Sequence, residues 1–319
     1  MPILRSVSRE ERRRRRRERR LKRIAMLPAM FTLGNLLFGF GAICCCLLSI
    51  KADGADLAKM TLSSPHLERA FPTFLSIGAF LIFLGGICDG LDGRVARWTR
   101  KTSDFGGQLD SLADMMTFGA APALLVVCLI IALPAPASWP DELVTLARRA
   151  TWVAAALFTA CAALRLARFN VENVHEETAH YWFKGLPSPG AAGAVLSLVL
   201  LHEHVRSILA TLAHVIQFVL PPATLFLGLL MVSRIRYAHV TNLYFRRKRP
   251  LWHLVAVLFI ILTALLKPAW GLAAIACTYA LSGPVGEAIR RLFGQASTPQ
   301  ADEAQAEPSR PQDASNQVG

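Results

Sequence analysis

Residues 89–114 read DGLDGRVARWTRKTSDFGGQLDSLAD and connect two strongly apolar segments of the chain. The stretch contains Asp89, Asp92, Asp110 and Asp114, close to the points where the apolar segments end. A charged side chain at the centre of a membrane helix costs about 2.5 to 3.5 kcal/mol even on the scale that gives the smallest values. Four carboxylates gathered at such a boundary therefore indicate a bound cation, and hard divalent metals are the best candidates.

Long apolar runs make up much of the remaining chain, which has 319 residues, 53% of them hydrophobic and 18% charged. Eight runs approach the length of about 20 residues with which a helix crosses the hydrocarbon of a bilayer. They cover residues 26–50, 71–88, 109–133, 151–166, 189–201, 208–232, 251–266 and 270–289, and the fifth is short. We predict an all-α, polytopic helical membrane protein with about eight transmembrane helices.

The basic residues indicate how these helices are oriented. A dense basic block at residues 12–23 precedes the first predicted span, and the net charge of the chain is +13. Further arginines and lysines follow the second, fourth and sixth predicted spans, within residues 94–101, 165–184 and 234–249. By the positive-inside rule, this alternation predicts that both termini and the acidic segment face the cytoplasm.

The spacing of the acidic residues suits two helices that share one site. Asp89 and Asp92 are three residues apart, and Asp110 and Asp114 are four apart, so each pair projects from one helical face. All-oxygen ligands favour Mg²⁺ or Mn²⁺ over zinc or copper, and two such ions would nearly balance four carboxylates. The neighbouring glycines are expected to let the two helices approach closely. These are Gly90, Gly93, Gly106 and Gly107.

The full pattern, Asp89-x2-Asp92-Gly93-x2-Ala96-Arg97-x8-Gly106-x3-Asp110-x3-Asp114, resembles the signature of the CDP-alcohol phosphatidyltransferases. The resemblance implies a core of six membrane helices around an interfacial cytoplasmic site, usually in a homodimer. It also implies residue roles. Asp89, Asp92 and Asp110 would be metal ligands, Asp114 both a ligand and the catalytic base, and Gly93, Arg97 and Ser103 contacts of the CDP group.

Segments outside this signature resemble the bacterial type II phosphatidylserine synthases, a branch of the same family. They are residues 31–35 (FTLGN), 118–122 (FGAAP), 165–170 (RLARFN), 185–189 (GLPSP) and 233–237 (SRIRY). The resemblance implies CDP-diacylglycerol and L-serine as substrates, phosphatidylserine and CMP as products, and a bacterial inner membrane as location. Glycerol-3-phosphate, inositol phosphate and choline stay open as other acceptors.

Several residues in these segments have two interpretations. Arg165 and Arg168 share a helical face next to Asn170, and they would bind the serine carboxylate or act as positive-inside anchors. Thr32 and Asn35 would hydrogen-bond the nucleotide or lipid phosphate, or they would form hydrogen bonds between membrane helices. Two turn-forming segments carry simpler expectations. Residues 185–189 are expected to begin the fifth span, and residues 118–122 to allow a bend or close packing.

We divide the chain into a basic interfacial arm (1–23), a catalytic membrane domain (24–240), a C-terminal transmembrane extension (241–293) and a disordered tail (294–319). The arm is expected to bind anionic lipids and not nucleic acid. The last two spans carry no polar constellation and are expected to be structural, and His202 and His204 are expected in a solvated loop. A divalent-cation transporter is the alternative from another class, but its acids would be expected near the membrane midplane.

Overall fold

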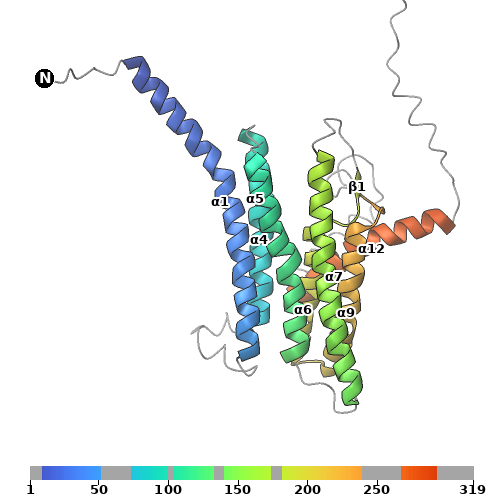
Figure 1. Ribbon diagram of the computed structural model, residues 1–319. Coiled ribbons are helices and arrows are strands. Elements are labelled where there is room, and N and C mark those ends of the chain that lie inside the picture. The colour runs from blue at the N-terminus through green and yellow to red at the C-terminus, as the bar shows by residue number, and fades with distance from the viewer. Residues whose placement is uncertain are drawn as a thin grey trace, which may run out of the picture.

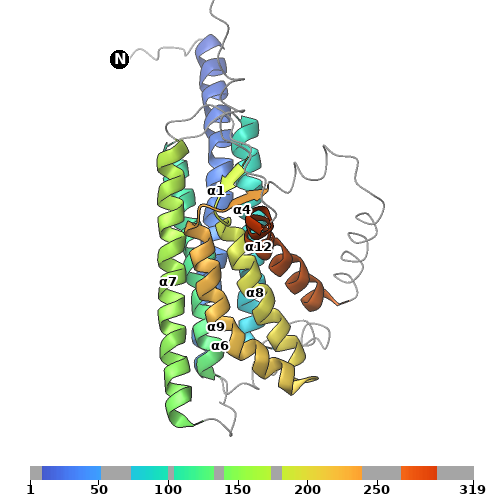
Figure 2. The ribbon, with the colours of Figure 1, turned by 90° about the vertical axis from the view of Figure 1, so that its right-hand side faces the viewer.

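The computed structural model describes residues 9–51, 73–99, 104–132, 140–173, 182–238 and 267–292. Helices form most of these ranges, and most of them lie side by side in an elongated bundle from which part of α12 projects sideways (Figures 1 and 2). This confirms the predicted all-α membrane fold. The helices are α1 (Arg9–Lys51), α4 (Phe74–Thr99), α5 (Asp104–Asp114), η1 (Met115–Ala120), α6 (Ala121–Ala132), α7 (Asp141–Asn173), α8 (Ser188–Val205), α9 (Ala210–Val232) and α12 (Pro268–Leu292).

Six helical segments in the described ranges are long and apolar enough to cross a membrane, so the chain is an integral membrane protein. They are Ala29–Ile50, Phe74–Val95, Phe105–Ala132, Asp141–Val171, Ala210–Val232 and Pro268–Ile289. These correspond to six of the eight predicted spans. The predicted span at 251–266 lies outside the described residues, and the fifth corresponds to α8, which is not among the six. The count of eight is therefore not confirmed.

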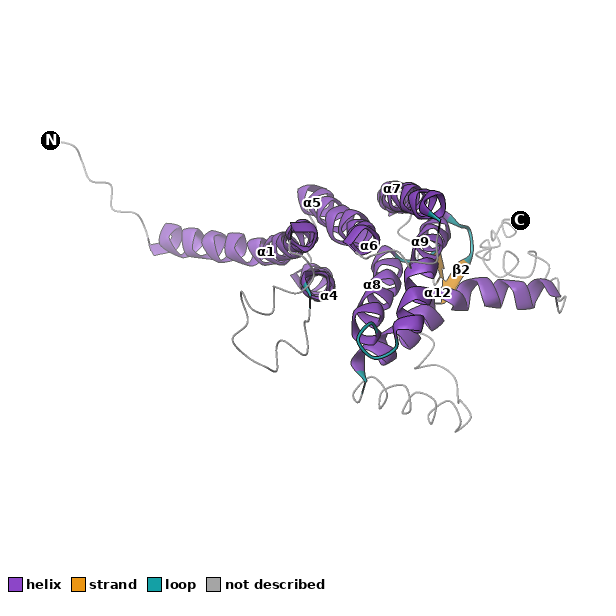
Figure 3. Ribbon diagram, turned by 90° about the horizontal axis from the view of Figure 1, so that it is seen from below, coloured by secondary structure: helices purple, strands orange, loops and turns teal. Residues whose placement is uncertain are grey.

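Helix α8 is surrounded largely by other helices of the bundle. Most of its side chains are buried, among them Ala191, Val195 and Val199, each at 0% exposure. It contacts α4, α6, α9 and α12, and Figure 3 shows it beside α6, α9 and α12. A helix in this position needs small side chains that allow close packing more than it needs high hydropathy. This explains why its sequence gives a weak membrane signal.

The expectation of solvated loop histidines is wrong for His202. Helix α8 continues past residue 201, so His202 lies inside the bundle and is only 2% exposed. Its Nδ1 is 3.1 Å from Oε1 of Glu203, which is itself buried, and Arg206 donates to the other Glu203 oxygen at 3.4 Å. This network satisfies the buried polar groups at the end of α8 that is opposite Ser188.

Helices α1 and α4 approach η1 at two glycines. A Cβ at Gly39 would overlap Thr117, and a Cβ at Gly85 would lie 2.7 Å from Cγ2 of Thr117 and 2.8 Å from Oδ1 of Asn35. The Thr117 hydroxyl donates to the backbone oxygen of Asn35 at 2.9 Å. The three segments therefore meet around Asn35 and Thr117 with no room for larger side chains.

The segment η1 is a π-helix between α5 and α6, and Pro122 helps to explain it. Proline has no N–H and its ring crowds the carbonyl four residues earlier, which disfavours a regular α-helix. The backbone N–H of Ala121 instead bonds to the oxygen of Met116, five residues back. Such single π-turns occur often at functional sites. The turn begins directly after Asp114, and residues 118–122 thus combine an irregular turn with close packing.

Two short strands connect the beginning of α8 to the end of α9. Strand β1 (Trp182–Lys184) pairs antiparallel with β2 (Arg236–Ala238). Gly185 follows β1 with a φ of +85°, in the left-handed region where L side chains are strained, and a Cβ there would overlap the carbonyl of Met231. The N–H of Gly185 donates to Ile235 O at 2.8 Å. The segments at 185–189 and 233–237 therefore lie together.

Gly85→Ala tests the close packing around Asn35 and Thr117. We expect it to destabilise the bundle by about 1 to 3 kcal/mol, as overpacking of a tight interior does. Gly86→Ala is the matched control, since its Cβ would have its nearest neighbour, a Phe118 ring atom, at 3.6 Å. Thermal unfolding of both variants in detergent micelles measures the difference, and equal midpoints for the two would contradict the packing described here.

Candidate metal centre

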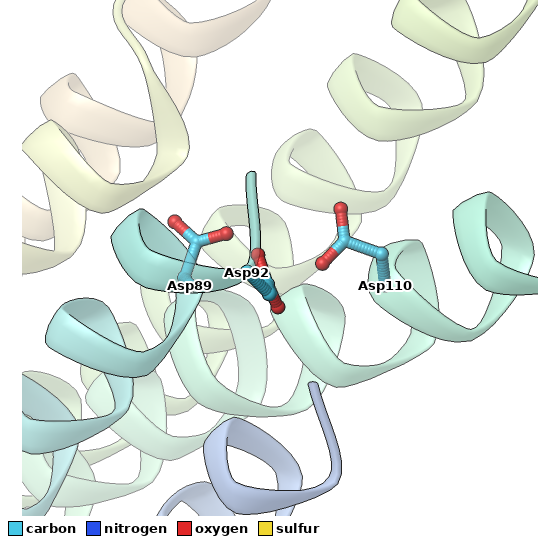
Figure 4. A group of neighbouring side chains, drawn as sticks. All are labelled: Asp89, Asp92 and Asp110. Atoms are coloured by element: carbon cyan, nitrogen blue, oxygen red, sulfur yellow. The ribbon is translucent and has the colours of Figure 1, made fainter. Parts of the chain in front are cut away.

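Three of the predicted acidic ligands converge at one end of the bundle. Asp89 and Asp92 come from α4 and Asp110 from α5, and one oxygen of each lies within 4.8 Å of those of the other two. Figure 4 shows the three carboxylates facing one another. They meet because α4 remains helical through Thr99, which keeps Asp89 and Asp92 on one face, and because α1 contacts both α4 and α5.

The donor set fits a divalent metal. Asp92 is 5% exposed, and its Oδ2 accepts a hydrogen bond from the Thr32 hydroxyl at 3.0 Å. Oδ1 of Asp110 is buried with no hydrogen-bond partner in the described structure. A buried carboxylate oxygen without a donor is costly unless a cation binds it. The all-carboxylate ligands are of the kind that Mg²⁺ and Mn²⁺ prefer.

Asp114 lies one helical turn beyond Asp110 and is not part of the group of closely spaced oxygens. It is 9% exposed, and its Oδ1 accepts a hydrogen bond from Nδ2 of Asn35 at 3.0 Å. Thr32 and Asn35 therefore form hydrogen bonds between helices, which is one of the two roles expected for them from the sequence. Because both bonds end on acidic residues of the centre, they also fix the orientation of these carboxylates.

Arg165 on α7 points toward the interior of the bundle. One of its terminal nitrogens, NH1, donates to the hydroxyl of Ser188 at 2.8 Å, and Ser188 is 1% exposed. Nε of Arg165 is buried with no hydrogen-bond partner among the described residues. Its guanidinium also interacts electrostatically with Asp114. An arginine that anchors a helix would direct its guanidinium toward headgroups instead.

Of the other predicted polar residues, the structure describes the side chains of Asn170 and Arg168. Nδ2 of Asn170 donates to the Ser111 hydroxyl at 2.9 Å and connects α7 with α5 beside Asp110. Arg168 is partly buried between Arg165 and Asn170 on α7. Ser103 and the side chain of Arg97 lie outside the part of the chain that the structure describes.

The expectation that the glycines near the aspartates let two helices approach closely is wrong for the three that the structure tests. A Cβ at Gly90, Gly93 or Gly107 would meet no described atom within 4 Å. These positions face open space, and close helix contact occurs deeper, at Gly39 and Gly85.

Sequence reasoning missed Ser111, Thr117 and Ser188, which orient Asn170, Asn35 and Arg165. Serine and threonine are common in membrane helices, so their presence alone does not indicate a functional site. Ser188 could have been found, because it lies inside the segment 185–189 that resembles the phosphatidylserine synthases.

The chain matches the family model of the CDP-alcohol phosphatidyltransferases over residues 25–221. It is also similar to proteins named CDP-diacylglycerol–serine O-phosphatidyltransferase. The relative from Helicobacter pylori is 32% identical over 68% of this chain and 80% of its own length. The relative from Bacillus subtilis is 30% identical over 67% of this chain and 90% of its own length.

A relative of the same name from Mycobacterium tuberculosis is 36% identical, and here the match spans about half of each protein, 48% of this chain and 48% of the relative. The family match includes α4, α5 and the three converging aspartates, as well as Asp114 and Arg165. On the extent of this match, the chain belongs to the CDP-alcohol phosphatidyltransferase family.

Proposed function

We propose that the chain transfers the phosphatidyl group of CDP-diacylglycerol to the hydroxyl of L-serine and releases CMP. The observation that carries this proposal is the arrangement at one end of the bundle, where three aspartates converge near Asp114 and an inward-facing Arg165. The names of the relatives from H. pylori and B. subtilis support the choice of serine.

Asp89, Asp92 and Asp110 would hold the divalent ions, Mg²⁺ or Mn²⁺ and two in number, with Asp114 as a further ligand. When bound, the ions would neutralise charge on the diphosphate and on the departing CMP. The hydrogen bond from Thr32 keeps Asp92 turned toward the other two carboxylates. The protein's main contribution is then to position the reacting groups.

Asp114 is the proposed general base. The serine hydroxyl oxygen forms a bond to the phosphorus of the phosphatidyl group, the bond from that phosphorus to CMP breaks, and the hydroxyl proton passes to Asp114. The hydrogen bond from Asn35 occupies Oδ1 of Asp114, so Oδ2 is the proposed proton acceptor. Asn35 is in turn held by Thr117, which makes it a positioning residue for this carboxylate.

Arg165 is the proposed partner of the serine carboxylate, with Arg168 and Asn170 nearby on α7. Guanidinium groups bind carboxylates with two parallel hydrogen bonds, and Arg165 has a buried Nε that lacks a partner in the described structure. Its inward direction and its bond to Ser188 favour this role over that of a membrane anchor.

The open side of α4 is the proposed place of the donor lipid, where Gly93, Arg97 and Ser103 would contact the CDP group. The basic residues support a cytoplasmic orientation of this end, in a bacterial inner membrane. We also propose a homodimer, and an N-terminal basic arm that binds anionic lipids and no nucleic acid.

The proposed function is tested with purified protein in mixed micelles that contain CDP-diacylglycerol and Mn²⁺ or Mg²⁺. CMP release is followed with L-serine, glycerol-3-phosphate, inositol phosphate or choline as acceptor. We expect release to require the metal and serine. Release with another acceptor but not with serine would overturn the choice of acceptor, and no release with any of them would overturn the enzymatic function.

Arg165→Ala should raise the KM for serine at least tenfold and change the KM for CDP-diacylglycerol little, because a charged hydrogen bond to one substrate is lost. Arg148→Ala is the control, since Arg148 is exposed near the opposite end of α7. Steady-state kinetics with each substrate varied in turn gives both constants. An equal loss for both substrates would count against the contact with serine.

A further inference from the structure

Helix α12 lies outside the segment that matches the family, which ends at residue 221, yet it reaches the functional end of the bundle. It runs antiparallel to α8. Near its start, Ala273 packs in a cluster with Leu201 and Val205 from the end of α8. Near its middle, Tyr279 lies against Gly190, in the first turn of α8. The helix therefore extends along α8 from the opposite end to the position of Ser188.

The ring of Tyr279 is held tightly in this position. A Cβ at Gly190 would lie only 2.9 Å from Cε1 of Tyr279, so only glycine leaves space for the ring. On another side the ring of Tyr237 is 6.1 Å away between centroids, at a tilt of 52°. Gly190 is two residues from Ser188, which accepts the hydrogen bond from Arg165. Tyr279 is thus adjacent to the residues that orient Arg165.

Tyr237 fixes α12 at the same level. Its hydroxyl donates to the carbonyl of Ala280 at 2.9 Å, and its ring occupies the space that a side chain at Gly283 would need. Burial raises the pKa of Tyr237 to about 12, so this hydroxyl stays protonated as a donor. A buried hydrogen bond and a glycine contact together determine which residue of α12 faces α8.

We propose that α12 completes the acceptor subsite and that Tyr279 is a specificity-determining residue, whose hydroxyl donates to the acceptor carboxylate beside Arg165. This inference rests on the proposed function and deepens it. Its physical basis is that Tyr279 is partly buried, lies against Gly190 in the first turn of α8 and is within electrostatic range of Arg165. This proposed role goes beyond the structural one that the sequence analysis expects for the last spans.

The chemistry suits an amino-acid acceptor. A guanidinium alone attracts any anion, including the phosphate of a phosphorylated alcohol. A neutral phenol adds a directional donor without a second positive charge, which favours a singly charged carboxylate over a doubly charged phosphate. The two groups would hold the carboxylate while the acceptor hydroxyl reaches Asp114.

Tyr279→Phe tests the hydroxyl, because the ring and its contact with Gly190 remain. We expect the KM for serine to rise about tenfold, with the KM for CDP-diacylglycerol and the thermal midpoint unchanged. Thr278→Val, which removes a hydroxyl from an exposed neighbouring position, should leave all three values as in the wild type. An unchanged KM for serine in Tyr279→Phe would overturn the proposal.

A second pair of variants displaces Tyr279 without changing it. Gly190→Ala should push the ring away and also raise the KM for serine, whereas a Cβ at Gly193 meets no described atom within 4 Å, so Gly193→Ala should behave as the wild type. Equal losses for both substrates in Gly190→Ala, together with a normal Tyr279→Phe, would show that Tyr279 only packs.

The failure of this inference differs from the failure of the proposed function. If the wild type uses another alcohol in place of serine, the function is wrong in its acceptor, and the same variants are measured with that alcohol. A raised KM for it in Tyr279→Phe would still support the role of α12 in the acceptor subsite. If the wild type does not release CMP with any of the acceptors, both proposals fall.

Discussion

Mutual repulsion among three aspartates is the constraint on which this end of the bundle depends. Two unit charges 4.8 Å apart repel by about 3.5 kcal/mol at an effective dielectric constant of about 20. A hydrogen bond such as that from Thr32 contributes about 1.5 to 3 kcal/mol when its acceptor is charged. The bond from Thr32 to Asp92 therefore cannot offset repulsion between three pairs. A divalent cation can, so the electrostatics as well as the ligand type support the proposed metal site.

The surrounding structure keeps these carboxylates together. It also contains buried polar atoms that are available to bind a ligand. Gly39 and Gly85 let α1, α4 and η1 meet around Asn35 and Thr117, and this packing orients Asp114. In the described structure, the buried side-chain atoms without a hydrogen-bond partner all belong to this end: Oδ1 of Asn35, Oδ1 of Asp110 and Nε of Arg165. At the opposite end of α8, His202, Glu203 and Arg206 bond to one another, as expected of a structural network.

The sequence predicts the parts of this structure that follow from local patterns. Apolar length predicts the membrane helices, and the spacing of Asp89, Asp92 and Asp110 predicts that they share a site. It does not predict α8 well, because burial within protein relaxes the need for hydropathy that lipid imposes. Nor does it distinguish Gly85, which packs against Asn35, from Gly90, which borders open space. Tyr279 could not be foreseen, since its position depends on how α12 packs along α8.

The most direct test of the central claim is Mn²⁺ binding to the substrate-free protein in detergent micelles, measured by the loss of the free-ion electron paramagnetic resonance signal. The structure predicts saturable binding that Asp110→Asn weakens at least tenfold, because one of three converging carboxylates is lost. Asp141→Asn, at an exposed position at the start of α7, should bind as the wild type does. Equal Mn²⁺ affinity in Asp110→Asn and the wild type would contradict a metal centre at these aspartates.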